Sequence, residues 1–118
     1  MQKILLIIND APYGTEKAYN ALRMAMTLQK NHKDIKIQIF LLADAVFCGL
    51  PEQKTPEGFY NTERMFRSVI RKGGEVKSCG GCSEARGIDK IKFIEGVQLS
   101  NMNEFAQWTV DADKVLTF

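Results

Sequence analysis

Two cysteines in the second half of the chain are the residues whose type and spacing best suit chemistry. They are separated by two glycines, in the order Cys79-Gly80-Gly81-Cys82. A thiolate is a nucleophile and a metal ligand, and a pair with this spacing can also cycle between dithiol and disulfide. The motif therefore leaves three chemistries open: nucleophilic sulfur chemistry, metal binding and redox cycling.

Metal binding and thioredoxin-like cycling fit the rest of the sequence poorly. Structural zinc takes four ligands, so Cys48 and His32 would have to complete the set from remote positions that lack paired spacing. All three prolines precede the cysteine pair, whereas thioredoxin-like folds usually place a cis-proline opposite their dithiol. We therefore predict no metal site and no cofactor, and redox cycling on another fold stays an alternative.

Cys79 is the better candidate nucleophile of the pair. It leaves a predicted strand and enters a helical turn, where unpaired backbone N–H groups favour the thiolate and are expected to lower its pKa from about 8.5. Lys77 and Arg86 are close in sequence and are candidates to add positive potential. A lone cysteine is more often a small buried hydrophobe, and this is how we interpret Cys48; the second cysteine and the glycines favour a reactive Cys79.

The elements that must position this pair begin with a buried strand. The apolar run Lys3–Ile8 is typical of a strand buried on both faces, as parallel sheets require. Apolar residues at helical spacing follow from Ala18 to Leu28, with Gly14 or Thr15 as the expected cap. A second strand is predicted at Ile35–Leu42. Strand, helix and strand in this order indicate a right-handed parallel crossover.

Alternating elements over the rest of the chain predict a three-layer α/β fold, with a mainly parallel sheet flanked by helices, as one domain over residues 1–118. The elements expected after the second strand are a helical turn at Ala43–Gly49, a mobile loop at Leu50–Phe59, a helix around Met65–Ile70 ending at Gly73, strands at Glu75–Ser78, Val97–Ser100 and Lys114–Phe118, and a helix from Asn101 to Val110.

In open parallel sheets, functional groups gather beyond the carboxyl ends of the strands. Two segments fall at such ends, Asn9–Gly14 after the first strand and Cys79–Arg86 after the third. If these two strands are neighbours, the two loops face each other across a crevice.

Composition and charge exclude several classes of protein. The chain is 45% hydrophobic and 25% charged with a net charge of +2, and its charges are interleaved, which argues against nucleic acid as a partner. The early apolar run Ile4–Ile8 is too short for a signal peptide or a membrane span. We therefore expect a cytoplasmic location, and three cysteines, an odd number in a reducing compartment, predict no disulfide framework.

Several segments, in the same order along nearly the whole chain, carry a resemblance to a known family: Ile8–Arg23, Leu42–Val46, Cys79–Ile88, Ala106–Trp108 and Ala112–Phe118. They resemble the DsrE/DsrF-like family and its YchN-like branch in particular. The resemblance implies a flavodoxin-like parallel sheet flanked by helices, and assembly into a homo-oligomer, commonly a trimer or a hexamer.

The resemblance also implies a link to sulfur relay, in which better-understood relatives carry sulfur as a cysteine persulfide. Their active cysteine falls at Cys79, which would take sulfur from a donor protein and pass it to an acceptor thiol. Cys82 is then a candidate resolving thiol and Arg86 a candidate for charge stabilisation. Alternatives are a thiol–disulfide redox sensor using both cysteines, or an oligomeric binding module in which they are incidental.

The resemblance adds one further segment to the site. The loop Asn9–Gly14 matches a family segment that borders the cysteine, which supports the crevice suggested by the strand ends. The candidate binding residues in it are Asn9, Pro12, Tyr13 and Gly14.

Overall fold

A parallel sheet forms the centre of the computed structural model, which describes residues 1–58 and 60–118. Within these residues the sheet has five strands in the order β4-β3-β2-β1-β5, and neighbouring strands run parallel. The predicted α/β class with a parallel sheet is confirmed. The strands are β1 (Gln2–Ile8), β2 (Ile35–Leu41), β3 (Glu75–Cys79), β4 (Val97–Ser100) and β5 (Lys114–Thr117).

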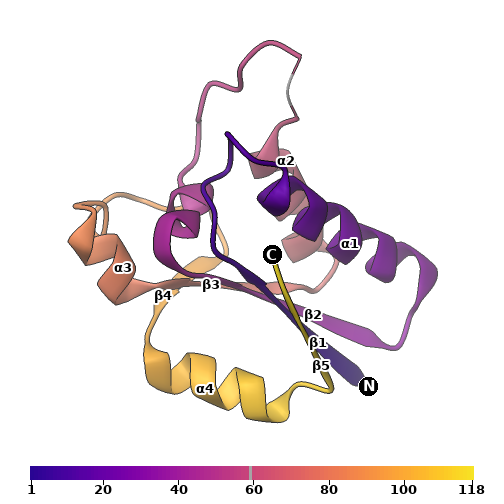
Figure 1. The fold of residues 1–118 in the computed structure, drawn as a ribbon. Helices are drawn as coiled ribbons and strands as arrows, with labels where there is room; N and C mark the ends of the chain where they lie inside the picture. The colour runs from indigo at the N-terminus through magenta and orange to yellow at the C-terminus, as the bar shows by residue number, and fades with distance from the viewer. Residues whose placement is uncertain (59) are drawn as a thin grey trace.

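Helices lie on both faces of the sheet, which gives the predicted three layers (Figure 1). The helices α1 (Lys17–Asn31) and α2 (Thr62–Arg71) pack together on one face, and α4 (Met102–Asp111) covers the other. The 3-10 helix η1 (Ala43–Gly49) and the short helix α3 (Gly80–Ala85) lie beside each other beyond the carboxyl ends of the strands.

Alternation along β1 divides the core between the two faces. Leu6 is fully buried beneath α1 and α2, whereas its neighbour Leu5 points to the other face and packs with Phe40 and Trp108. Phe40 stacks on Phe105 of α4 at 4.3 Å between ring centroids, and it meets the Trp108 ring edge-on at 6.2 Å. The α4 layer is therefore held to the sheet mainly by aromatic packing.

The start of α1 differs from the predicted one. α1 has Glu16 as its N-cap rather than Gly14 or Thr15, although the Thr15 hydroxyl, which donates to the Asp10 carboxylate, also accepts from the Lys17 N–H at 3.4 Å. Asn101 caps α4, since its Oδ1 accepts the Glu104 N–H at 2.9 Å. The Glu104 carboxylate turns instead to Ser100 and Lys77.

The segment between η1 and α2 contains no helix or strand at residues 50–58 and 60–61. The loop expected at Leu50–Phe59 matches this, although Phe59 lies outside the described residues and the expected mobility stays a prediction. The Gln53 side chain fastens the segment to the Phe47 carbonyl at 2.7 Å. None of the helices in the described part of the chain is long and apolar enough to cross a membrane.

Candidate functional site

Cys79 stands at the junction of β3 and α3, where it is the last strand residue and the N-cap of the helix. Its side chain caps the helix N-terminus, as serine or aspartate side chains do in many helices. The sulfur Sγ accepts a hydrogen bond from the Cys82 N–H at 3.2 Å, and the Ser83 hydroxyl donates to the Cys79 carbonyl at 2.9 Å. The candidate nucleophile is partly exposed at the carboxyl end of its strand, with a backbone donor at its sulfur.

Cys82 has a backbone donor of its own. The Ala43 N–H, from the first residue of η1, donates to Cys82 Sγ at 3.4 Å. Ala43 has a φ of 51°, a left-handed conformation that costs a residue with a Cβ about 1 kcal/mol. Both sulfurs of the pair therefore accept backbone hydrogen bonds, one from within α3 and one from η1.

The two cations near the pair are each matched by a carboxylate. Arg86 Nε lies 2.9 Å from Asp44 Oδ1, and Arg86 Nη1 donates to the Cys82 carbonyl at 3.1 Å. Lys77 Nζ lies 3.5 Å from Glu104 Oε1. These contacts of Arg86 are made to oxygen atoms, so its role in charge stabilisation stays a prediction.

The pKa of Cys79 is raised above the ordinary value of 9.0, so the expectation of a lowered pKa is wrong. Burial is the largest cause, and a hydrogen bond to the Cys82 side chain is the next; both favour the neutral thiol. The N–H groups of Cys82 and Gly81 lower the pKa as expected, but they are outweighed. Cys79 therefore rests as a thiol at neutral pH and must lose its proton before it attacks.

Cys48, the third cysteine, is 1% exposed within η1. Its Sγ donates to the Asp10 carbonyl at 3.6 Å, and burial raises its pKa to about 12. A thiol in this state is protonated and inaccessible at neutral pH. Cys48 thus fastens η1 to the loop that follows β1.

The loops after β1 and β3 do not face each other directly, because β2 lies between these strands. The condition on which the crevice hypothesis depended is therefore not met. Instead, η1 joins the two loops, through Cys48 to Asp10 at one end and through Ala43 to Cys82 at the other. Sequence reasoning missed Ala43 and Asp44, although the place of η1 after the end of a strand was a signal for them.

The candidate binding residues of the first loop contact other parts of the chain. The Asn9 side chain donates to the carbonyl of the C-terminal residue at 3.1 Å, and the Tyr13 hydroxyl lies 3.0 Å from Thr55 Oγ1. Pro12 is buried, and Gly14 is exposed with a φ of 113°. These contacts hold the loop in shape, and the binding role of its residues stays a prediction.

The two glycines between the cysteines differ in their surroundings. A Cβ on Gly80 would lie 2.8 Å from the Ser100 carbonyl oxygen, whereas a Cβ on Gly81 would meet nothing within 4 Å. We expect Gly80→Ala to lower the free energy of unfolding by about 1–3 kcal/mol, since backbone must move. Gly81→Ala is expected to leave it unchanged or raise it by up to about 1 kcal/mol, since alanine favours the helix. Urea denaturation of both variants measures the contrast, and equal stabilities would contradict the close approach of α3 to β4.

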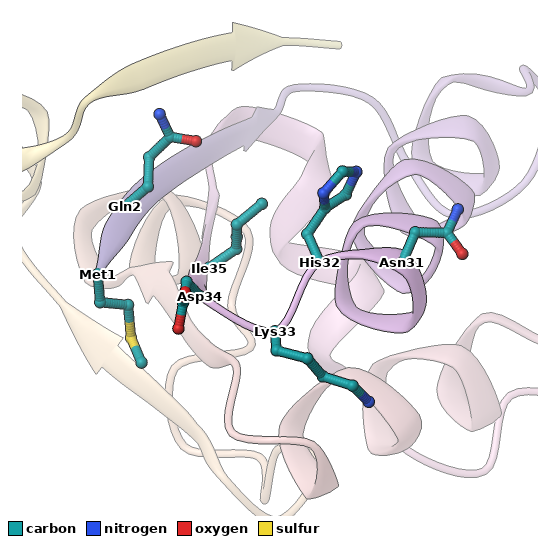
Figure 2. Close-up of a pocket in the computed structure, with 7 residues that line it drawn as sticks. All are labelled: Met1, Gln2, Asn31, His32, Lys33, Asp34 and Ile35. Atoms are coloured by element: carbon teal, nitrogen blue, oxygen red, sulfur yellow. The ribbon is translucent and has the colours of Figure 1, made fainter.

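A hollow of about 570 Å³ lies at the opposite ends of the strands from Cys79 (Figure 2). It is lined by Met1, Gln2 and residues 31–35, where α1 passes into β2. Its position separates it from the cysteine pair. Among residues 1–58 and 60–118, no group of three or more His, Cys, Asp or Glu side chains is placed to hold a metal ion.

Comparison with known sequences gives matches along the whole chain. The model of the DsrE/DsrF-like family matches residues 2–118. Protein YchN of Escherichia coli K12 is 43% identical over 118 residues, which is the full length of both chains. An uncharacterised protein of Methanopyrus kandleri is 42% identical over 115 residues, which cover 98% of this chain and 93% of that protein.

Solved structures agree with the sequence matches. The crystal structure of the Escherichia coli ychN protein superposes with a TM-score of 0.94 at 43% identity, with both chains covered in full. A protein of unknown function from Methanobacterium thermoautotrophicum also covers both chains in full, with a TM-score of 0.82 at 11% identity. That second likeness concerns the fold alone.

Proposed function

Because this chain belongs to the DsrE/DsrF-like family, we propose that it is a sulfur-relay protein, which carries sulfane sulfur as a persulfide on Cys79 and passes it to an acceptor thiol. The family is associated with sulfur relay. The observation that most supports this role is the position of Cys79, partly exposed at a strand end with the Cys82 N–H at its sulfur.

The proposed transfer has two steps, and Cys79 is first the nucleophile and then the leaving group. The Cys79 thiolate attacks the sulfane sulfur of a donor, the donor's own sulfur–sulfur bond breaks, and Cys79 gains one sulfur atom. An acceptor thiolate then attacks the terminal sulfur and displaces the Cys79 thiolate. A backbone N–H beside the sulfur stabilises negative charge in both steps.

We also propose that the protein is a homo-oligomer, a trimer or a hexamer, that works in the cytoplasm with donor and acceptor proteins. Exposed apolar side chains on β4 and α4 support assembly: Leu99 is 45% exposed, Met102 63% and Val110 79%. A reducing compartment suits a chain whose three cysteines are free thiols. Sedimentation velocity gives the number of subunits.

The test of sulfur carriage is the intact mass of the reduced protein after exposure to inorganic polysulfide. We expect the wild type to gain one sulfur atom and Cys79→Ser to gain none, because the nucleophile is gone. Cys82→Ala is expected to take up sulfur and retain it longer. An unchanged mass of the wild type, or equal uptake by Cys79→Ser, would contradict the proposal and favour the redox sensor or the binding module.

A further inference from the structure

Cys82 is linked to η1 directly at its sulfur, through the Ala43 N–H, and indirectly at its carbonyl, through Arg86 and Asp44. We propose that Ala43 and the Asp44–Arg86 ion pair position Cys82 as the resolving thiol, which closes a disulfide with Cys79 and releases hydrosulfide. This inference rests on the proposed function and deepens it, because it gives the loaded protein a second way to discharge its sulfur.

The contacts form a closed ring between η1 and α3. The Ala43 N–H donates to Cys82 Sγ at 3.4 Å, and Asp44 is the next residue along the chain. Asp44 Oδ1 accepts from Arg86 Nε at 2.9 Å, and Arg86 Nη1 donates to the Cys82 carbonyl at 3.1 Å. The ring therefore holds both the side chain and the backbone of Cys82 against η1.

The conformation of Ala43 supports a role beyond connecting β2 to η1. Its φ of 51° lies in the left-handed region, which residues with a Cβ seldom occupy. The residue before it is fixed on both sides, since the Leu42 N–H donates to the Ile8 carbonyl and the Leu42 carbonyl accepts from Ala45, both at 2.9 Å. Such outliers gather at functional sites, and here the outlier is the residue whose N–H meets the sulfur.

The chemistry of the step balances without an added oxidant. The Cys82 thiolate attacks Sγ of the Cys79 persulfide, the bond between that Sγ and the terminal sulfur breaks, and hydrosulfide leaves with the electron pair. The sulfane sulfur is reduced and the two cysteine sulfurs are oxidised to the disulfide. A backbone N–H at Cys82 Sγ stabilises the attacking thiolate and fixes where it stands.

The first test breaks the Asp44–Arg86 ion pair, which is one link of the ring. Wild-type protein, Arg86→Gln and Asp44→Asn are exposed to inorganic polysulfide, and the ratio of disulfide closure to sulfur loading is followed by intact mass and hydrosulfide release. Dividing closure by loading corrects for a change in the reactivity of Cys79, so the ratio reports on Cys82 itself once thermal unfolding has shown that both variants are folded. We expect the ratio to fall about tenfold in both variants, which corresponds to about 1.4 kcal/mol. Arg67→Gln, which removes a similar ion pair with Glu63 on α2, is the matched control and is expected to keep the wild-type ratio.

The second test addresses the backbone of Ala43. Glycine adopts a positive φ freely, whereas valine strongly disfavours it. We therefore expect Ala43→Val to lower the ratio about tenfold and Ala43→Gly, the conservative variant, to stay within about twofold of the wild type. Thermal unfolding of both variants confirms that folded proteins are compared.

Failure of this inference is separable from failure of the proposed function. If the wild type takes up no sulfur, closure is measured instead after Cys79 has been capped with glutathione from glutathione disulfide, where attack by Cys82 releases glutathione. Unchanged closure in Arg86→Gln and Ala43→Val would overturn the positioning role. Faster closure would overturn it too, since the ring would then keep Cys82 away from Cys79.

Discussion

Alkylation of Cys79 by iodoacetamide is expected to speed up about 100-fold between pH 6 and pH 8, because the thiolate is the reactive form. The pKa of Cys79 is raised above 9.0, chiefly by burial. Below that pKa the thiolate fraction grows about tenfold for each pH unit. The rate, measured by peptide mass spectrometry, should still be rising at pH 8, and a plateau below pH 8 would contradict the raised pKa.

The same experiment separates the contributions of the other two cysteines. Cys82→Ala removes the side-chain hydrogen bond that raises the pKa of Cys79, so the rate profile of this variant is expected to shift to lower pH. Cys48 is expected to stay unmodified in the folded protein over this range, since it is buried with a pKa of about 12. Unfolding in urea should expose it, which gives an internal control.

The raised pKa of Cys48 also fixes the sign of its effect on stability. Because the folded state prefers the neutral thiol, its contribution is complete below the ordinary pKa of 9.0 and is lost as the pH rises towards about 12. For the proposed sulfur relay at neutral pH, this leaves Cys48 as a structural thiol and Cys79 and Cys82 as the two partly exposed cysteines. The proton on Cys79 then has to be removed by solvent or by the donor as it binds.

The elements were predictable wherever a strong local pattern specifies them. The apolar run at β1 and the helical spacing of α1 identified both elements to within about three residues. The order of the strands was not predictable in the same way, because the local sequence does not state on which side of β1 each later strand is added. The structure places β2 between β1 and β3. The loops after β1 and β3 therefore do not face each other, and η1, which follows β2, lies between them and contacts both.

In the candidate site, the position of Cys79 at the end of a strand was predictable from the sequence, and its surroundings were not. Cys79 could be found because a cysteine pair at the end of a strand is visible in the sequence. Ala43 could not, since the backbone N–H that it offers to Cys82 is common to every residue but proline and comes from 39 residues away. The predicted decrease in the pKa of Cys79 was wrong for a similar reason. The N–H groups that lower this pKa are local, but the burial that raises it comes from residues distant in the sequence, such as Leu5 and Phe40.

Phe40→Ala is expected to lower the free energy of unfolding by about 3–5 kcal/mol. Phe40 is 1% exposed and joins the sheet to α4 through its contacts with Phe105 and Trp108. Urea denaturation measures the loss. Phe66→Ala is the matched control, because Phe66 is fully buried on the other face of the sheet and should cost a similar amount.

The two phenylalanine variants are expected to differ in what they do to the site. Cys79 packs against the cluster of Leu5, Phe40 and Trp108, and burial is the main cause of its raised pKa. Phe40→Ala should therefore lower the pKa of Cys79 and change the fluorescence of Trp108, the only tryptophan in the chain, whereas Phe66→Ala should alter neither. Equal effects of the two variants on Cys79 alkylation at pH 7 would show that the α4 layer does not control the state of the thiol. A selective effect of Phe40→Ala would connect the aromatic packing beneath α4 directly to the protonation of the proposed sulfur carrier.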